Sequence, residues 1–214
     1  MATDLGLRER KKRQTRQLIF ETAFRLFTEL GFDAVTVADV ARAADLSEVT
    51  VFNYFPTKED LFFGGMEVFE ERLLEAVRGR AAGESALAAF RRLVVDSFSR
   101  VAAEENAPVI ARSAALIDAS AALQARELEV VARYTRLLAA MLAEETGDSA
   151  AAVEPWAVAS ALMGTHRAVV AHVRNRVLAG KRGRQLAADA RSQAIRGFAC
   201  LERGIGEYAV RPKR

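Results

Sequence analysis

Several residue types are scarce in this chain of 214 residues, and each scarcity excludes a class of protein. The single cysteine, Cys200, rules out an intrachain disulfide. Its apolar helical surroundings predict a small buried side chain rather than a redox sensor. No apolar run reaches the ~18 residues that a membrane-spanning helix needs. The basic N-terminus has no following apolar segment or cleavage site, so we find no secretory signal and expect a cytoplasmic protein.

Motifs for catalysis, nucleotide binding and metal binding are also missing. Gly-x-Ser-x-Gly is absent, and the dipeptide Gly180-Lys181 lacks the earlier glycine of a phosphate-binding loop. The pair Gly204-Ile-Gly206 follows a helical pattern rather than a strand, which excludes a dinucleotide-binding loop. His166 and His172 lie about 240° apart around a helix, so they cannot share one face to bind a metal. We therefore predict no enzyme activity, no cofactor and no metal.

Prolines and glycines are few, at four and 13, which leaves little room for long linkers. Hydrophobic residues make up 51% and charged residues 28%, which is typical of a globular chain. Alanine is abundant and no segment alternates convincingly as a strand, so the composition predicts an all-α fold. The length allows one or two domains with a sizeable core.

The stretch from Thr36 to Leu61 predicts two short helices joined by a tight turn, followed by the start of a third. Thr36 precedes Asp39 by three residues, which is the spacing of a capping box. Asp45 suits the left-handed backbone that such a turn often needs. Ser47 caps the second helix, which the proline after it ends. This arrangement is a helix-turn-helix.

The outward face of the second helix carries almost no charge, unlike a solvated helix face. A helix that enters a major groove needs small, apolar and amide groups for base edges and thymine methyls. We therefore predict that this face contacts DNA; the alternative is that Phe52 packs on a neighbouring helix. The residues of the face are Val49, Thr50, Phe52 and Asn53.

The segment from Arg13 to Leu61, about a quarter of the chain, resembles the DNA-binding half of the TetR family of bacterial transcriptional regulators. The resemblance rests on IFETAFRLFTELGFDAVTVADVARAADLS followed by VTVFNYFPTKEDLF. The chain departs from the family pattern at Asp45, where glycine is common, at the pair Glu48-Val49, and at Phe52, where tyrosine is usual. The resemblance implies a helix-turn-helix regulator that pairs as a homodimer.

Roles for individual residues follow from this arrangement. Lys58 begins a helix, a position that favours phosphate binding. Glu48 could accept a hydrogen bond from a cytosine amino group, and Tyr54 would contact phosphate or base. The full set predicted to contact DNA is Thr36, Ser47, Glu48, Val49, Thr50, Phe52, Asn53, Tyr54 and Lys58.

A basic segment precedes the helix-turn-helix, since residues 8–16 hold six Lys or Arg and one acid. Such an arm can lie along phosphates or in a minor groove, or it can remain solvated. We expect residues 1–10 to be disordered.

Helical periodicity predicts about nine helices in total. The fourth would act as a rigid lever between a DNA-binding domain over 1–57 and a ligand-binding and dimerisation domain over 58–214. The predicted ranges are 12–30, 37–44, 48–55, 58–80, 84–104, 107–119, 121–146, 150–179 and 184–207.

The last two helices carry long apolar stripes, which can serve one core or meet their copies in a four-helix bundle. We favour a homodimer through these helices, because two-fold pairing places two recognition helices one DNA turn apart, ~34–36 Å. An apolar pocket between helices would hold a small, largely apolar effector that releases a repressor from its operator. Ordinary core packing is the better explanation for each side chain taken alone, because any helical bundle shows such apolar stripes. The pocket candidates are Phe90, Phe98, Leu116, Met141, Trp156, Met163 and His166.

Two alternatives stay open at the level of the sequence. One is a DNA-binding regulator that activates transcription or acts without a ligand. The other is a helical ligand-binding or interaction protein, whose three-helix unit docks protein instead of DNA. Binding to duplex DNA that weakens with salt would argue against the second.

Overall fold

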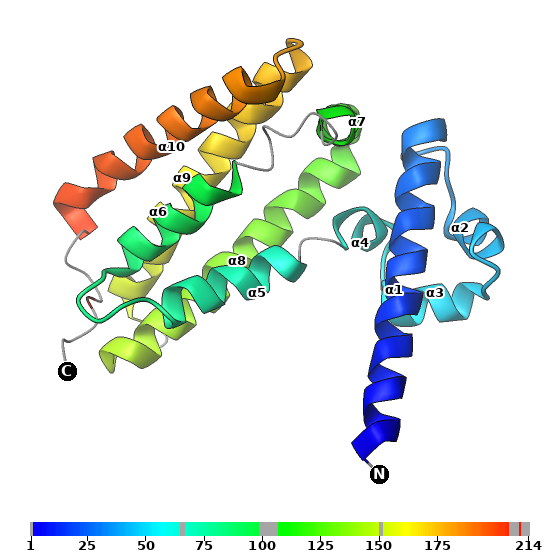
Figure 1. Cartoon of the computed structure of the whole chain (residues 1–214), viewed down its shortest axis with the longest axis horizontal. Helices are drawn as coiled ribbons and strands as arrows, with labels where there is room; N and C mark the ends of the chain where they lie inside the picture. The colour runs from blue at the N-terminus through cyan, green and yellow to red at the C-terminus, as the bar shows by residue number, and fades with distance from the viewer. Residues whose placement is uncertain (1, 65–66, 99–106, 150–151, 206–209, 211–214) are drawn as a thin grey trace. The chain divides into compact units, whose positions relative to one another are not determined.

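The computed structural model describes residues 2–64, 67–98, 107–149, 152–205 and 210. These residues are organised as helices and their connections, which confirms the all-α prediction (Figure 1). None of the described helices is both long enough and apolar enough to cross a membrane. Ten helices lie within the described residues: α1 Ala2–Leu30, α2 Val37–Ala43, α3 Glu48–Tyr54, α4 Lys58–Phe63, α5 Glu67–Arg78, α6 Ala86–Ser97, α7 Ala107–Ala119, α8 Ala121–Thr146, α9 Val153–Leu178 and α10 Gly183–Ile205.

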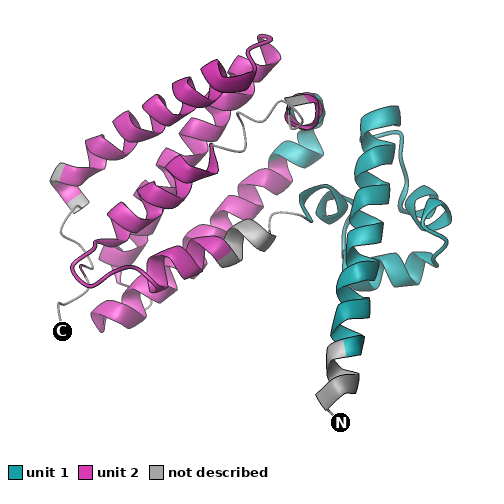
Figure 2. Cartoon of the chain, viewed as in Figure 1, with its two compact units in different colours: residues 1–67, 116–124 teal, residues 68–115, 125–214 magenta. Residues whose placement is uncertain are grey.

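The chain divides into two compact units (Figure 2). The head comprises residues 1–67 and 116–124, and the body comprises residues 68–115 and 125–214. The corner between α7 and α8 thus belongs to the head, although most of both helices belongs to the body. The functional division after residue 57 stays a prediction.

An aromatic cluster forms the core of the head. Phe27 of α1 lies 5.0 Å from Phe32 and 6.4 Å from Phe62 of α4, measured between ring centroids. Phe63 packs edge-on against Phe62 at 5.0 Å. Aromatic pairs of this kind add ~0.5–1.5 kcal/mol each beyond the burial of their area. The packing therefore fixes α4 to α1 and makes α4 part of the head.

The remaining head core joins the other helices to this cluster. Val51 of α3 and the adjoining Phe55 are buried in it. Ile117 and Leu123, from the α7–α8 corner, are buried there too, and no sequence pattern had assigned them to the head. Ser120 caps α8 within that corner, because its hydroxyl accepts from the Leu123 backbone N–H at 3.4 Å.

Two predicted helix ranges differ most clearly from the described helices, and the end of the predicted helix 84–104 lies outside the described residues. The first helix begins at Ala2, not near residue 12, so the prediction of a disordered segment over 1–10 is wrong. The residues added include Arg8, Glu9, Arg10 and Lys11, which favour helix, and the apolar stripe that guided the prediction begins only at Ile19. The predicted helix 58–80 is described as α4 and α5, and residues 65–66 lie outside the described residues.

Gly64 follows α4 where only a glycine fits. A Cβ at this position would lie 2.5 Å from Cε1 of Phe55 and 3.2 Å from the Asp60 carbonyl oxygen. The first distance is far below van der Waals contact, so a side chain here would displace a ring of the head core.

Helices α9 and α10 of the body pack through the apolar stripes that the sequence predicted for the last two helices. The α9 stripe and the α10 stripe are buried within this one chain, so they serve its own core. A Cβ at Gly197 would lie 3.0 Å from the Thr165 side chain, which shows how closely α10 approaches α9. The buried stripe residues are Ala159, Leu162, Met163, Val169, Val173, Val177, Leu186, Ala190, Ala194 and Phe198.

Cys200 corrects one sequence expectation. It is exposed on α10, and its thiol donates to the Arg196 carbonyl oxygen at 3.3 Å. The prediction of a buried side chain is wrong because Cys200 lies two residues beyond Phe198, on the other side of the helix.

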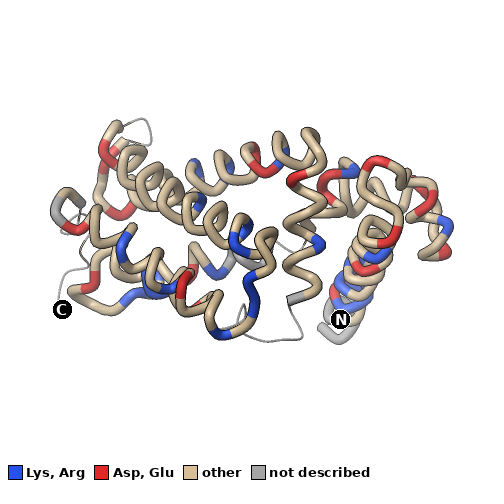
Figure 3. Tube along the Cα trace, turned by 90° about the horizontal axis from the view of Figure 1, so that it is seen from above, with Lys and Arg blue, Asp and Glu red and all other residues tan. Residues whose placement is uncertain are grey.

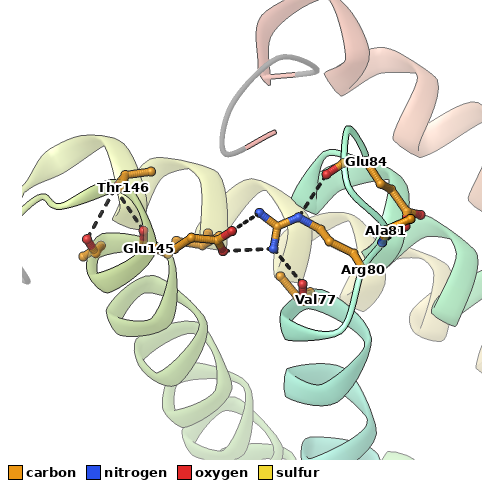
Figure 4. Close-up of polar contacts among 8 residues, drawn as sticks. Val77, Arg80, Ala81, Glu84, Glu145 and Thr146 are labelled. Atoms are coloured by element: carbon orange, nitrogen blue, oxygen red, sulfur yellow. Dashed lines mark hydrogen bonds and ion pairs between the residues drawn. The ribbon is translucent and has the colours of Figure 1, made fainter. Parts of the chain in front are cut away.

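A fully buried arginine, Arg80, follows α5 in the body (Figure 4). Its guanidinium donates to both carboxylate oxygens of Glu145 on α8, at 2.5 and 2.9 Å. It also donates to the backbone carbonyl oxygens of Val77, at 2.6 Å, and Glu84, at 3.0 Å. These contacts compensate the buried charge and fix the end of α5 against α8.

Candidate nucleic-acid interface

The start of the helix-turn-helix is fixed by short-range hydrogen bonds. The Thr36 hydroxyl accepts from the Asp39 backbone N–H at 3.2 Å, and the Thr36 backbone N–H donates to the Asp39 carboxylate at 3.0 Å. This confirms the predicted capping box. The same carboxylate accepts from the Thr36 hydroxyl, and these bonds hold the pKa of Asp39 below its usual value.

The turn after α2 depends on Asp45. Its φ is 55°, the left-handed conformation that the sequence predicted for it. The Leu46 backbone N–H reaches back to the Ala41 carbonyl oxygen at 2.9 Å. This geometry ends α2 and redirects the chain into α3.

Helix α3 has only two turns and is capped at its start. The Ser47 hydroxyl accepts from the Thr50 backbone N–H at 3.1 Å. Phe55 follows in extended conformation, as expected for the residue before a proline. Only Val51 within α3 is fully buried, so the helix rests on the head along one narrow side.

The outward face of α3 is exposed and apolar. Val49 is 70% exposed, and Phe52 is 45% exposed. Asn53 and Glu48 are exposed beside them. The exposure of Phe52 argues against the alternative in which it packs on a neighbouring helix.

Several predicted DNA contacts already have partners within the head. The hydroxyls of Thr36 and Ser47 cap helices. Tyr54 packs partly against the head core. The Lys58 ammonium lies 4.3 Å from the centroid of the Phe32 ring and 3.4 Å from the Asp33 carbonyl oxygen.

Arg16 of α1 is a contact that the sequence did not reveal. Its guanidinium donates to the Tyr54 carbonyl oxygen at 2.7 Å and lies 4.2 Å from the centroid of the Phe55 ring. The sequence placed Arg16 only at the end of a basic segment. The partners are 38 residues apart, so no spacing rule connects them. Figure 3 shows the basic residues that precede it along α1.

Two candidate ligand residues, Phe90 and His166, lie close together in the body. The rings of Phe90 and His166 are 6.3 Å apart, and Phe198 lies 5.8 Å from Phe90. Met163 is buried on the same helix as His166. Burial disfavours the charged imidazole and lowers the pKa of His166 to about 4, although the negative charge of Glu127 acts in the opposite direction.

The other candidate ligand residues lie elsewhere. Leu116 packs against the head core, and Trp156 is 38% exposed on α9. Met141 lines an open hollow of about 290 Å³, whereas Phe98 lines a different one of about 310 Å³. The described structure therefore does not gather the seven into one site, and the effector pocket stays a prediction.

Sequence comparison identifies the family to which these features belong. Residues 19–64 match the family described as bacterial regulatory proteins of the tetR family, and residues 84–191, half of the chain, match the MftR C-terminal domain. The chain belongs to the TetR family of transcriptional regulators. It is therefore a DNA-binding regulator rather than an enzyme, as the sequence predicted.

Characterised relatives match parts of the chain. TcmR of Streptomyces glaucescens, a helix-turn-helix transcriptional regulator, is 36% identical over 84 residues, which are 39% of this chain and 37% of TcmR. The chain thus spans little more than a third of that relative. The fatty acid metabolism regulator protein of Bacillus subtilis is 27% identical over 140 residues, covering 63% of this chain and 70% of that protein.

Solved structures share the fold. NalD, the secondary repressor of the MexAB-OprM multidrug efflux pump in Pseudomonas aeruginosa, aligns with a TM-score of 0.57 at 22% identity, over 87% of this chain and 96% of NalD. FadR of Bacillus subtilis in complex with stearoyl-CoA aligns with a TM-score of 0.54 at 20% identity, over 86% of this chain and 97% of FadR.

Proposed function

We propose that the protein is a homodimeric repressor that contacts its operator through α3 and leaves it when a small, largely apolar effector binds the body. The observation that carries this proposal is the exposed face of α3. Val49, Phe52 and Asn53 are left open to solvent on a helix whose two ends are both held by hydrogen bonds.

The chemistry of this face suits base edges. Val49 and Phe52 offer apolar contact to thymine methyls, and the Asn53 amide can pair with adenine. Lys58, at the first position of α4, can turn from the Phe32 ring to a phosphate at little cost, since its bond to Asp33 is long. Base contacts would come from α3, and orientation from the residues around it.

A second exposed face supports pairing through α9 and α10. The exposed residues of α9 from Val153 to Leu178 are mostly small or apolar, with Ala157, Gly164 and Ala171 among them. Ile195 is 43% exposed on α10. Because the predicted stripes are already buried within the chain, this other face is the one available to a second copy.

Two observations support an effector with an apolar portion. The Bacillus relative matched over most of its length is named for fatty acid metabolism, which favours an acyl chain. In the body, the His166 imidazole stays neutral at physiological pH next to Phe90. A neutral ring can accept or donate one hydrogen bond to a polar group at the end of an apolar ligand.

Effector binding would act through the chain segments that join body and head. The chain passes between the two units after residues 67, 115 and 124. An effector that binds one arrangement of these segments more tightly than another changes the free energy of DNA binding. The change is at most the difference between its binding free energies for the two arrangements.

Two substitutions in the head test the proposed DNA contacts. Asn53→Ala should abolish operator selectivity, because it removes a base contact while phosphate contacts stay. Lys58→Ala should weaken binding to all duplexes and lower the slope of log affinity against log salt by about one unit for each chain. Binding is measured by fluorescence anisotropy on a duplex that the parent protein enriches from a random pool.

The exposed Lys181 in the body provides the matched control. Lys181→Ala removes the same charge and should leave the affinity unchanged. Parent-like selectivity and salt slope in both head variants would contradict the assigned contact face.

Addition of long-chain fatty acids or acyl thioesters to the complex of the parent protein with DNA tests release by an effector. A complex that survives a large excess of these ligands would contradict an acyl effector.

A further inference from the structure

The end of α3 is hydrogen-bonded to a side chain from a different helix, α1. Arg16 of α1 donates from its guanidinium to the carbonyl oxygen of Tyr54, the last residue of α3, at 2.7 Å. The same guanidinium lies 4.2 Å from the centroid of the Phe55 ring. Phe55 is buried in the head core, so the arginine is fixed on two sides.

The end of α3 needs such a partner. The helix has seven residues, and helices of this length are unstable on their own. The last carbonyl groups of a helix have no partner within it and carry a partial negative charge. A guanidinium at this end satisfies one carbonyl and also opposes the helix dipole. Ser47 provides the corresponding contact at the start of α3.

We propose that Arg16 is a positioning residue for DNA recognition, which fixes the orientation of α3 on α1 by binding its last carbonyl group and stacking on Phe55. This inference rests on the proposed function, because it takes α3 as the helix that contacts bases. Arg16 contributes to selectivity through α3 and not through a contact of its own with DNA.

The shape of the guanidinium explains why an arginine is suited to this position. Its plane can cover an aromatic ring while one N–H points along the edge to an acceptor. A lysine has the charge but not the plane, so it cannot make both contacts in the same way. Arg16 therefore differs from the other basic residues of its segment. Arg13, for instance, has a side chain that is 80% exposed and lies 3.5 Å from Glu9.

A phosphate contact is the rival explanation, and salt dependence separates the two. Each lost phosphate contact lowers the salt slope by about 0.9 and weakens binding to every duplex. Loss of a positioning contact weakens binding to the selected sequence alone and leaves the slope unchanged. It also loosens α3 in the free protein, which hydrogen exchange can detect without DNA.

The experiment compares the parent protein with Arg16→Gln and with Arg13→Gln as the charge-matched control. The probes are the duplex that the parent enriches from a random pool and a scrambled duplex of the same composition. Arg16→Gln should lose roughly tenfold or more in affinity for the enriched duplex. Its affinity for the scrambled duplex and its salt slope should match the parent. Exchange in peptides covering residues 47–55 should be faster in Arg16→Gln alone.

Other outcomes overturn the proposal. An equal loss on both duplexes with a lower salt slope would make Arg16 a phosphate contact. Parent-like selectivity would show that Arg16 does not position α3 for recognition, whatever the exchange rate. If Arg16→Gln does not fold, Arg16→Lys replaces it, and this variant should keep the parent's salt slope while losing selectivity. If the parent enriches no duplex, the proposed function fails by itself, and unchanged exchange in Arg16→Gln would separately refute the contact to α3.

Discussion

The head and the body are stabilised by different kinds of contact. In the head, the rings of Phe27 and Phe32 pack against Phe62 of α4, and the starts of α2 and α4 are held by side chains three residues away. In the body, ion pairs join distant parts of the chain. Arg80 binds Glu145 across 65 residues, and Arg174 binds Glu127 across 47.

The contrast suits the tasks proposed for the two units. An apolar aromatic core holds the short helix α3 in one orientation, which the proposed base recognition requires. Buried and half-buried charges in the body leave polar groups among apolar helices, where the proposed effector would exchange contacts with them. Substitutions that remove one kind of contact should therefore affect one unit and spare the other.

The largest effect is expected at the buried ion pair of the body. Glu145→Gln removes the negative charge that pairs with the fully buried Arg80 guanidinium, so the body should lose about 3 kcal/mol of unfolding free energy. Urea unfolding followed by hydrogen exchange in α5 and α8 measures the loss. Glu144→Gln, at the exposed neighbouring position, is the control and should change little. Equal stability of the two variants would contradict the contrast.

An effect of intermediate size is expected from His166 on acidification. Its pKa is about 4 in the folded protein and near 6.5 in the unfolded chain, so the unfolded chain binds the proton more readily between these values. The contribution of His166 to the unfolding free energy is therefore fully present above pH 6.5. It falls by on the order of 2–3 kcal/mol as the pH drops towards 4.

The His166→Gln variant isolates this contribution. Its unfolding free energy should vary less than the parent's between pH 6.5 and 4, while both should behave alike at pH 7.5. Asp39 of the head has a lowered pKa, so its contribution to the unfolding free energy is fully present above pH 3.8, its usual pKa. That contribution is lost only as the pH falls below 3.8. An identical pH profile for His166→Gln and the parent would show that burial does not hold the imidazole neutral.

The smallest effect is expected at the turn of the head. Asp45 has a φ of 55°, which glycine adopts without strain, so Asp45→Gly should raise the stability of the head by about 0.5–1 kcal/mol. Asp45→Ala should lower it by a similar amount. Thermal unfolding of the two variants measures the difference, and the same melting temperature for both would rule out strain at this turn.

The difference between short-range and long-range contacts also explains which features could be predicted from the sequence. Capping by Thr36 and Ser47, the left-handed Asp45 and the end of α3 before Pro56 depend on neighbours within a few residues, and all are confirmed. The ranges of α7 and α8 were predicted equally well, since apolar periodicity and punctuating residues are local signals.

Long-range contacts could not be predicted in this way. Neither the bond from Arg16 to Tyr54 nor the burial of Arg80 leaves a pattern in the sequence, because each partner lies dozens of residues away. Leu123 joins the head core from a helix that otherwise belongs to the body. The contact residues of the effector are subject to the same limit, and their assignment stays a prediction.

The central claim is that two copies of the chain place two α3 helices in successive major grooves. Hydroxyl-radical footprinting of the enriched duplex, combined with native mass measurement of the complex, tests it most directly. The account predicts two protected regions about 10 base pairs apart, two chains or a multiple of two on each duplex, and loss of the pattern in Asn53→Ala. A single protected region bound by one chain, or a pattern unchanged in Asn53→Ala, would contradict it.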